Sequence, residues 1–182
     1  METQVASDPF STLGDLDRRF RVLREGGQGA GQGQHEWTGV LFRVGGDRIL
    51  AAMPSLSEIV PLPNFVRVPG VKRWVLGLAN LHGALIPIVD LPAFLGGAPI
   101  SRADVGQRLL VVTDGNQRFG LLVNEVFGMK HYWAGDESED RPALLSGVAE
   151  FVSKAYRRYG EHYAVLDLPR LLAHPSFTQA SL

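Results

Sequence analysis

The chain has 182 residues, of which 45% are hydrophobic, which is enough for a folded core and excludes global disorder. The 18 Lys and Arg residues nearly cancel the 19 Asp and Glu residues, which argues against a domain that holds nucleic acid or anionic lipid through a broad basic field. The absence of cysteine excludes disulfide scaffolds, thiolate zinc sites and thiol catalysis.

The sequence shows neither a signal peptide nor an apolar run of the roughly 18 residues that a membrane-spanning helix needs. We therefore expect a cytoplasmic protein without direct membrane insertion. The 21 Gly and 11 Pro residues indicate many turns and short elements, which favours a mainly β fold.

Residues 1–35 predict an N-terminal helix followed by a Gly/Gln-rich linker. The run from Gly26 to Gly33 cannot carry regular structure and ends the helix. This helix either folds back onto the domain or docks a partner. Its apolar stripe, at helical spacing, consists of Leu13, Leu16, Phe20 and Leu23.

Two hairpins are predicted in the rest of the chain, because apolar residues alternate with polar or small ones on either side of a turn. The first turn is Gly45–Asp47 and the second is Asp114–Asn116. The four strands concerned are predicted at residues 40–44, 49–53, 109–112 and 119–123.

A further pair of strands is predicted at residues 74–81 and 85–89, with a break at His82–Gly83 between them. Pro87 in the second of these favours a position at the edge of a sheet. Later strands are expected at 147–152 and 163–166, with an acidic surface loop around residues 136–140 before them.

An internal repeat is the most informative feature of the sequence. Residues 89–95 (VDLPAFL) recur as 166–172 (LDLPRLL), at an offset of 77. In each copy an Asp, Asp90 or Asp167, is placed to cap a short helix whose first turn tolerates the following proline. Two weaker matches, Gly77–Ala79 with Gly147–Ala149 and Gly46 with Gly115, have offsets of 70 and 69. The repeat predicts two similar β lobes, each a small barrel or strongly curled sheet.

No set of reactive groups suggests an enzyme. The five histidines show no metal-ligand spacing, and we expect neither a metal nor a cofactor. Asp136, Ser138 and Asp140 imitate the start of a calcium loop, but Arg141 and Gly147 occupy the positions that need Gly and Glu.

Single-stranded nucleic-acid binding is an alternative from a different class, because small β barrels often perform it. Two clusters interleave basic and aromatic residues, Lys72–Trp74 and Lys154–Tyr159. The near-zero net charge speaks against this alternative, and a solvated face also explains both clusters.

Several motifs occur in a characteristic order: residues 56–60 (LSEIV), 77–91 (GLANLHGALIPIVDL) and 120–126 (GLLVNEV). Together they resemble the CheW coupling proteins of bacterial chemosensory systems, over residues 37–172. Residues 37–42 (WTGVLF) and 68–74 (VPGVKRW) are most similar to the subgroup that serves the type IV pilus, or twitching motility, pathway.

The resemblance implies a mainly β domain over residues 36–175, made of two intertwined five-stranded β-barrel lobes with short helices, and a C-terminal tail over 176–182. It also implies a non-catalytic adaptor in a two-component signalling system. Such an adaptor holds the signalling tip of a methyl-accepting chemoreceptor and the regulatory domain of a CheA-type histidine kinase in a membrane-associated array. Its output is expected to be pili; flagellar rotation is the alternative within the family.

The receptor and kinase interface is expected in a groove between the lobes, where an apolar stripe of a receptor helix can lie. Leu56 and Glu58 match family positions at this groove, and Val123 and Asn124 match it in the second lobe. The interface residues that the resemblance implies are Leu56, Glu58, Val71, Leu78, Asn80, Leu81, His82, Gly83, Val123 and Asn124.

Two of these residues depart from the family pattern. His82 stands where the family usually has Arg, and it lacks the permanent charge and the bidentate fork of a guanidinium. Asn124 stands where Asp is frequent. If position 82 contacts a partner, we expect shape or a single hydrogen bond to select that partner, and not a strong ion pair.

Overall fold

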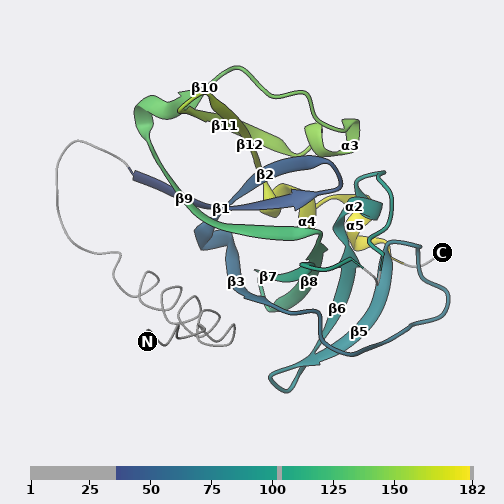
Figure 1. Cartoon of the computed structure of the whole chain (residues 1–182). Helices are drawn as coiled ribbons and strands as arrows, with labels where there is room; N and C mark the ends of the chain where they lie inside the picture. Colours follow the sequence, from purple (N-terminus) through teal and green to yellow (C-terminus); the bar gives the residue numbers. More distant parts are fainter. Residues whose placement is uncertain (1–35, 102–103, 181–182) are drawn as a thin grey trace, which may run out of the picture. The chain divides into compact units, whose positions relative to one another are not determined.

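The computed structural model describes residues 36–101 and 104–180 (Figure 1). The helix and linker expected over residues 1–35 lie outside the described residues. Two six-stranded sheets carry the described part, which confirms the prediction of a mainly β fold. Among the described helices, none combines the length and apolar content that crossing a bilayer requires.

We call the two sheets lobe 1 and lobe 2. Lobe 1 consists of β1 (Glu36–Val44), β2 (Asp47–Ala52), β9 (Glu125–Trp133), β10 (Glu137–Ser138), β11 (Val152–Arg158) and β12 (Glu161–Leu166). Lobe 2 consists of β3 (Leu56–Val60), β4 (Phe65–Val66), β5 (Val75–Leu81), β6 (Ala84–Asp90), β7 (Arg108–Asp114) and β8 (Gln117–Val123). The helices are η1 (Met53–Ser55), α2 (Leu91–Phe94), η2 (Ala134–Asp136), α3 (Ser146–Ala149), α4 (Leu168–Leu172) and α5 (Pro175–Thr178).

The chain exchanges strands between the lobes. Hydrogen-bonded neighbours follow the order β10-β11-β12-β2-β1-β9 in lobe 1 and β3-β7-β8-β6-β5-β4 in lobe 2. The β1–β2 hairpin therefore belongs to lobe 1 while β3 to β6 cross to lobe 2, and β7–β8 stay in lobe 2 while β9 to β12 return to lobe 1 (Figure 1). Each lobe has one strand more than the five expected, because β4 and β10 are two-residue strands too short for an alternation pattern.

The register confirms the internal repeat and refines its offsets. Each lobe contains one parallel pair, β12 with β2 and β6 with β8. Ile88 lies opposite Gly120 in lobe 2, and Val165 lies opposite Leu50 in lobe 1, so the offset is 77 for β6 and β12 and 70 for β8 and β2. The hairpin turns obey the same offset of 70: Gly45 and Gly115 correspond, with φ of 59° and 56°.

Three local predictions were wrong. Residues 146–149 form α3 and not a strand, and the Val148 and Ala149 N–H groups donate to the Leu145 carbonyl. Gly147 packs so closely against the Leu95 carbonyl that no side chain fits there. The apparent match of Gly77 with Gly147 is therefore not part of the repeat, and β5 corresponds instead to β11. Pro87 is not on an edge strand, because β6 lies between β5 and β8. The β6–β8 ladder starts only at Ile88, so the missing N–H of Pro87 interrupts no hydrogen bond in that ladder.

The Asp caps follow the prediction. The Asp90 side chain accepts a hydrogen bond from the Ala93 N–H at 3.0 Å at the start of α2, and Asp167 accepts one from Arg170 at 3.0 Å at the start of α4. Asp90 also accepts from the Ile100 N–H at 2.8 Å and is 1% exposed. Burial raises the pKa of Asp90, and the two backbone donors oppose that rise.

An aromatic cluster joins the C-terminal helix to α2 and to lobe 2. Phe177 of α5 is buried and stacks on Trp74 at a centroid distance of 5.9 Å. It also meets Phe94 of α2 edge-on at 5.2 Å and Phe119 of β8 at 5.4 Å. The segment expected as a C-terminal tail thus contributes a side chain to the interior as far as residue 177.

Candidate partner-binding site

Glu58 lies at the centre of a charged network at one end of lobe 2. Arg118 Nη2 donates to Glu58 Oε1 at 2.7 Å, and His82 Nε2 lies 3.1 Å from Glu58 Oε2. The Glu58 side chain is only 16% exposed, whereas that of His82 is 67% exposed. Both carboxylate oxygens are thus engaged within the chain, and the imidazole forms the solvent side of the network.

These three residues come from segments that are not neighbours in the sheet. Glu58 belongs to β3, Arg118 to β8, and His82 to the turn between β5 and β6. Because β7, β8 and β6 separate β3 from β5 in the hydrogen-bonded order, the contact requires the sheet to curl until its ends approach. The network therefore ties the β5–β6 turn to the opposite edge of lobe 2.

The β5–β6 turn holds His82 in an unusual backbone conformation. Its φ is 52°, a left-handed value that is uncommon for a residue other than glycine, and Gly83 follows with φ of 82°. Two consecutive positive φ values suit the tight turn of a β hairpin. The Asn80 side chain accepts a hydrogen bond from the Gly83 N–H at 2.9 Å, so Asn80 stabilises this turn.

The remaining expected interface residues do not gather around Glu58. Leu56 and Leu81 are 6% and 8% exposed, so they lie beneath the surface near Glu58 and do not form it, and Val123 is fully buried elsewhere in the sheet. Leu78 and Val71 are half-buried, on β5 and in the segment before it.

Val123 and Asn124 were expected at the groove in a different lobe from Leu56 and Glu58, and this was wrong. The strand exchange places β3 and β8 in the same sheet. Val123 is five residues along β8 from Arg118, which is about 17 Å at the rise of a β-strand. The two groups of expected residues therefore lie at opposite ends of lobe 2.

Asn124 connects the lobes. Its Oδ1 accepts a hydrogen bond from the Gly45 N–H at 2.6 Å, and its own N–H donates to the Arg43 carbonyl at 3.0 Å. Arg43 in turn pairs with Glu125 at 3.4 Å. Since Asn124 is only 9% exposed, its observed role is to fasten the end of β8 to the β1–β2 turn.

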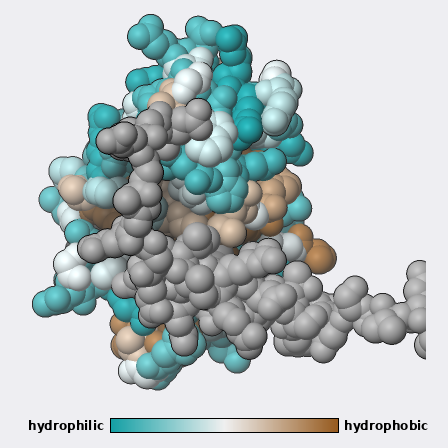
Figure 2. Space-filling view, turned by 90° about the vertical axis from the view of Figure 1, so that its left-hand side faces the viewer, coloured by the Kyte–Doolittle hydropathy of each residue, from teal (hydrophilic) through white to brown (hydrophobic). Residues whose placement is uncertain are grey.

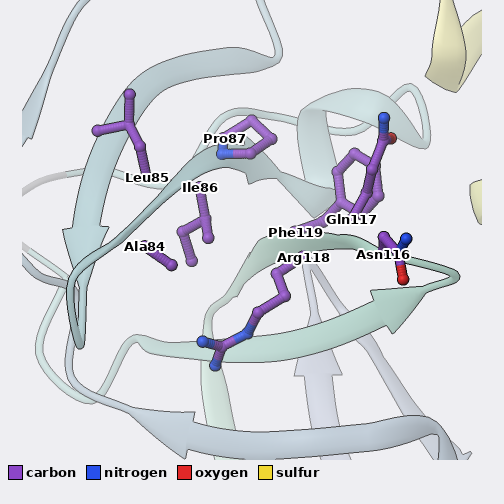
Figure 3. Close-up of a pocket in the computed structure, with 8 residues that line it drawn as sticks. All are labelled: Ala84, Leu85, Ile86, Pro87, Asn116, Gln117, Arg118 and Phe119. Carbon is purple, nitrogen blue, oxygen red and sulfur yellow. The ribbon is translucent and has the colours of Figure 1, made fainter.

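A pocket of about 400 Å³ adjoins the charged network, where β6 and β8 separate before their ladder begins. Arg118 belongs to both features, and its side chain extends beneath the pocket toward the side where Ala84 and Ile86 lie (Figure 3). Leu85, at the rim, is 67% exposed. The lining residues are Ala84, Leu85, Ile86, Pro87, Asn116, Gln117, Arg118 and Phe119.

Arg118 and the pocket were missed by the sequence analysis. The signal that was available is weak, because a single Arg in an alternating strand is normally a solvated residue. Its partner Glu58 is 60 positions away in the sequence, and only the curl of the sheet brings the two together.

Of the two aromatic residues in the Lys154–Tyr159 cluster, Tyr156 cannot stack on a base, whereas Tyr159 is 89% exposed. Tyr156 is 2% exposed, and its ring stacks on Trp37 at 4.6 Å and on Tyr132 at 4.8 Å, while Lys154 Nζ lies 5.0 Å from its centroid.

Within residues 36–101 and 104–180, no group of three or more His, Asp or Glu side chains is arranged to hold a metal ion.

Comparison with known proteins identifies the family. A family model described as CheW-like domain matches residues 38–176. The Protein PilI of Pseudomonas aeruginosa is 35% identical over 174 residues, which cover 96% of this chain and 97% of that protein. A Probable chemotaxis protein CheW of Rhizobium etli is 34% identical over 89 residues, 48% of this chain and 56% of that protein.

A solved structure supports the fold. The scaffolding protein TtCheW from Thermoanaerobacter tengcongensis superposes with a TM-score of 0.67 at 17% identity, covering 82% of this chain and 96% of that chain. The family model spans most of the described domain, and the PilI match extends over nearly the whole chain. The chain therefore belongs to the CheW-like family, and it is similar to PilI over nearly the whole length of both chains.

Proposed function

We propose that the protein is a non-catalytic cytoplasmic adaptor that couples a methyl-accepting chemoreceptor to a CheA-type histidine kinase in a membrane-associated array, and that this array controls type IV pili and twitching motility. The observation that carries the proposal is the 35% identity to PilI over nearly the full length of both chains. Flagellar output is the weaker alternative, because the match to the chemotaxis protein of Rhizobium etli covers only about half of each chain.

The end of lobe 2 around Glu58 is the contact surface that we propose for the receptor tip or the kinase regulatory domain. The surface combines an exposed imidazole, a carboxylate held in place by an arginine, and the exposed Leu85 at the rim of the pocket. Figure 2 shows one face of the molecule, on which hydrophilic colour gathers in the upper part and hydrophobic patches lie lower down. Apolar residues bordered by polar groups are typical of protein interfaces.

Binding of the two partners tests this function directly. The purified full chain is expected to capture a receptor signalling domain and, separately, a CheA-type kinase. Failure to bind either protein at concentrations on the order of tens of micromolar would refute the proposal, since such a complex would be weaker than about −6 to −7 kcal/mol.

Substitution of Glu58 tests the surface. Glu58→Gln keeps the size of the side chain but removes the charge that Arg118 pairs with, and we expect about tenfold weaker binding of one partner, or about 1.4 kcal/mol. Glu139→Gln is the matched control, because Glu139 is exposed in the loop after β10. Equal binding by both variants would show that the contact surface lies elsewhere.

A further inference from the structure

The two lobes carry equivalent residues at the pocket, and this equivalence indicates what the pocket accepts. In lobe 2, Ala79 of β5 lies opposite Ile86 of β6; in lobe 1, Tyr156 of β11 lies opposite Tyr163 of β12. The offset is 77 for both members of the pair. All four side chains are buried, at 1%, 1%, 2% and 7% exposed.

In lobe 1 the equivalent positions are occupied by a phenol and its polar partners. Burial raises the pKa of Tyr163, the side chain of Glu161 raises it further, and the side chain of Arg48 lowers it, so both side chains lie near the phenol hydroxyl. Its ring belongs to the interior cluster that also holds Tyr132 and Tyr156. Lobe 1 therefore satisfies a buried phenol with one guanidinium and one carboxylate.

The three corresponding positions in lobe 2 all line the pocket. By the offset of 77, Glu161 and Tyr163 correspond to Ala84 and Ile86. By the offset of 70, Arg48 corresponds to Arg118. Lobe 2 retains the arginine and lacks both the phenol and the adjacent carboxylate.

A carboxylate nevertheless reaches this arginine from another strand. Glu58 of β3 binds Arg118 Nη2 at 2.7 Å, so lobe 2 again holds an arginine–glutamate pair. A guanidinium has five N–H donors, and the contact with Glu58 leaves others for a further oxygen. The pocket volume of about 400 Å³ lies within the range of sites that hold small ligands, which is ample for one aromatic side chain.

We propose that this pocket receives a tyrosine side chain of a partner protein. The ring lies against Pro87 and Phe119, and the hydroxyl lies against the Arg118–Glu58 pair, as the hydroxyl of Tyr163 lies near Arg48 and Glu161 in lobe 1. The proposal rests on the adaptor function for the existence of the partner, whereas the pocket can be tested without any partner.

The pocket is tested first with two small probes. 4-Methylphenol is the tyrosine side chain with its Cβ atom as a methyl group, and toluene is the same molecule without the hydroxyl. Both are titrated into the isotope-labelled full chain and followed by amide NMR shifts. We expect saturable shifts confined to the lining residues, with a dissociation constant for 4-methylphenol on the order of 1 mM, as for a fragment of its size, and severalfold weaker binding of toluene. Absence of saturable shifts, or shifts elsewhere on the domain, would overturn the proposal.

The lobe 1 residues provide a variant that should close the pocket. The double substitution Ala84→Glu with Ile86→Tyr places in lobe 2 the side chains that lobe 1 accommodates at the same positions, and it should weaken 4-methylphenol binding more than tenfold. Val66→Tyr is the control, because it adds the same side chain at an exposed position of lobe 2 outside the pocket. If the double variant does not fold, Arg118→Leu takes its place and should abolish the preference for 4-methylphenol over toluene. Unchanged binding by the double variant, or an unchanged preference in Arg118→Leu, would contradict the proposal.

The same folded variants test whether the pocket binds a tyrosine of a partner protein. The double variant, or Arg118→Leu in its place, should lose at least tenfold in affinity for either the receptor domain or the kinase, and should keep its affinity for the other. Unchanged affinity for both, with 4-methylphenol binding lost, would refute a partner tyrosine while leaving the adaptor function intact. Failure of the unsubstituted chain to bind either protein would instead refute the adaptor function.

Discussion

Lobes 1 and 2 share one strand plan but fill it differently. The interior cluster of lobe 1 contains Tyr132, Tyr156 and Tyr163 with Trp37 packed against them, whereas the buried residues of the lobe 2 cluster are aliphatic and one aromatic residue, Phe65, packs against them. Lobe 2 in turn has the Glu58 network and the pocket. The difference shows that a duplicated β frame allows one copy to be filled by its own aromatic residues while the other keeps space and charge at its surface.

The same contrast appears at the equivalents of the charged network. By the offsets that relate the lobes, Glu58 corresponds to Gly128, Arg118 to Arg48, and His82 to Tyr159. Without a carboxylate at Gly128, Arg48 lies over the ring of Phe127 at 5.0 Å. The arginine is thus common to both lobes, and in lobe 1 the ring of Phe127 lies beside it where lobe 2 has the Glu58 carboxylate.

The largest expected effect concerns the aromatic interior of lobe 1. Tyr156→Ala removes a buried ring that stacks on Trp37 and Tyr132, and we expect the free energy of unfolding to fall by about 3–5 kcal/mol. Urea denaturation measures this change. Tyr159→Ala is the control, because this ring is 89% exposed and its loss should change stability by less than about 0.5 kcal/mol. Equal effects of the two substitutions would show that the aromatic interior contributes little.

The next effect compares the two helix caps. Asp90→Ala leaves two backbone donors without their partner in a buried site, so we expect a loss of about 2–3 kcal/mol. Asp167→Ala removes one bond from a more exposed site and should cost about 1 kcal/mol. Thermal or urea unfolding of both variants measures the difference. A larger loss for Asp167 would contradict the assigned contacts.

The pH dependence of Asp90 gives a smaller effect. Because burial raises the folded-state pKa of Asp90 above its ordinary 3.8, the folded protein holds this proton more tightly than the unfolded chain. The contribution of this group to stability is therefore complete below 3.8 and decreases as pH rises through the raised pKa. Unfolding free energies of the unsubstituted chain and Asp90→Asn, measured from about pH 3 to 7, should show this decrease only with Asp90 present. An increase with pH that depends on Asp90 would reverse the sign and refute the assignment.

The smallest effect concerns the equivalent turns. Tyr159 and His82 have φ of 51° and 52°, which glycine adopts without steric strain. Tyr159→Gly should raise the unfolding free energy by about 0.5 kcal/mol, since relief of strain exceeds the added chain entropy. His82→Gly should give no gain, because it also loses the contact with Glu58. Equal gains in both turns would mean that this contact does not stabilise the fold.

Features within short stretches of sequence were largely predictable. Both hairpins, the break at His82–Gly83 and the caps at Asp90 and Asp167 depend on residues a few positions apart, and all were found as expected. The strand predicted at 147–152 failed because Gly147 serves a close contact with Leu95, more than fifty positions earlier, and strand patterns carry no information on such contacts.

The candidate site was only partly predictable. Glu58 and His82 followed from the family motifs, and the structure joins them. Arg118 and the pocket could not be found, because they depend on the curl of lobe 2 and on the point where β6 and β8 separate. Val123 and Asn124 were expected in another lobe than Glu58, since family motifs do not indicate which sheet a strand joins.

The sequence by itself determined that this protein is a duplicated β domain of the CheW-like family, because turn residues, caps and strand alternation act over short distances and recur in both halves. Only the tertiary structure decided how the halves exchange strands, which carboxylate pairs with Arg118, and that lobe 2 has a pocket beside Arg118. The physical reason is that sheet register and curl are set by packing between residues far apart in the chain, and no local pattern records that packing.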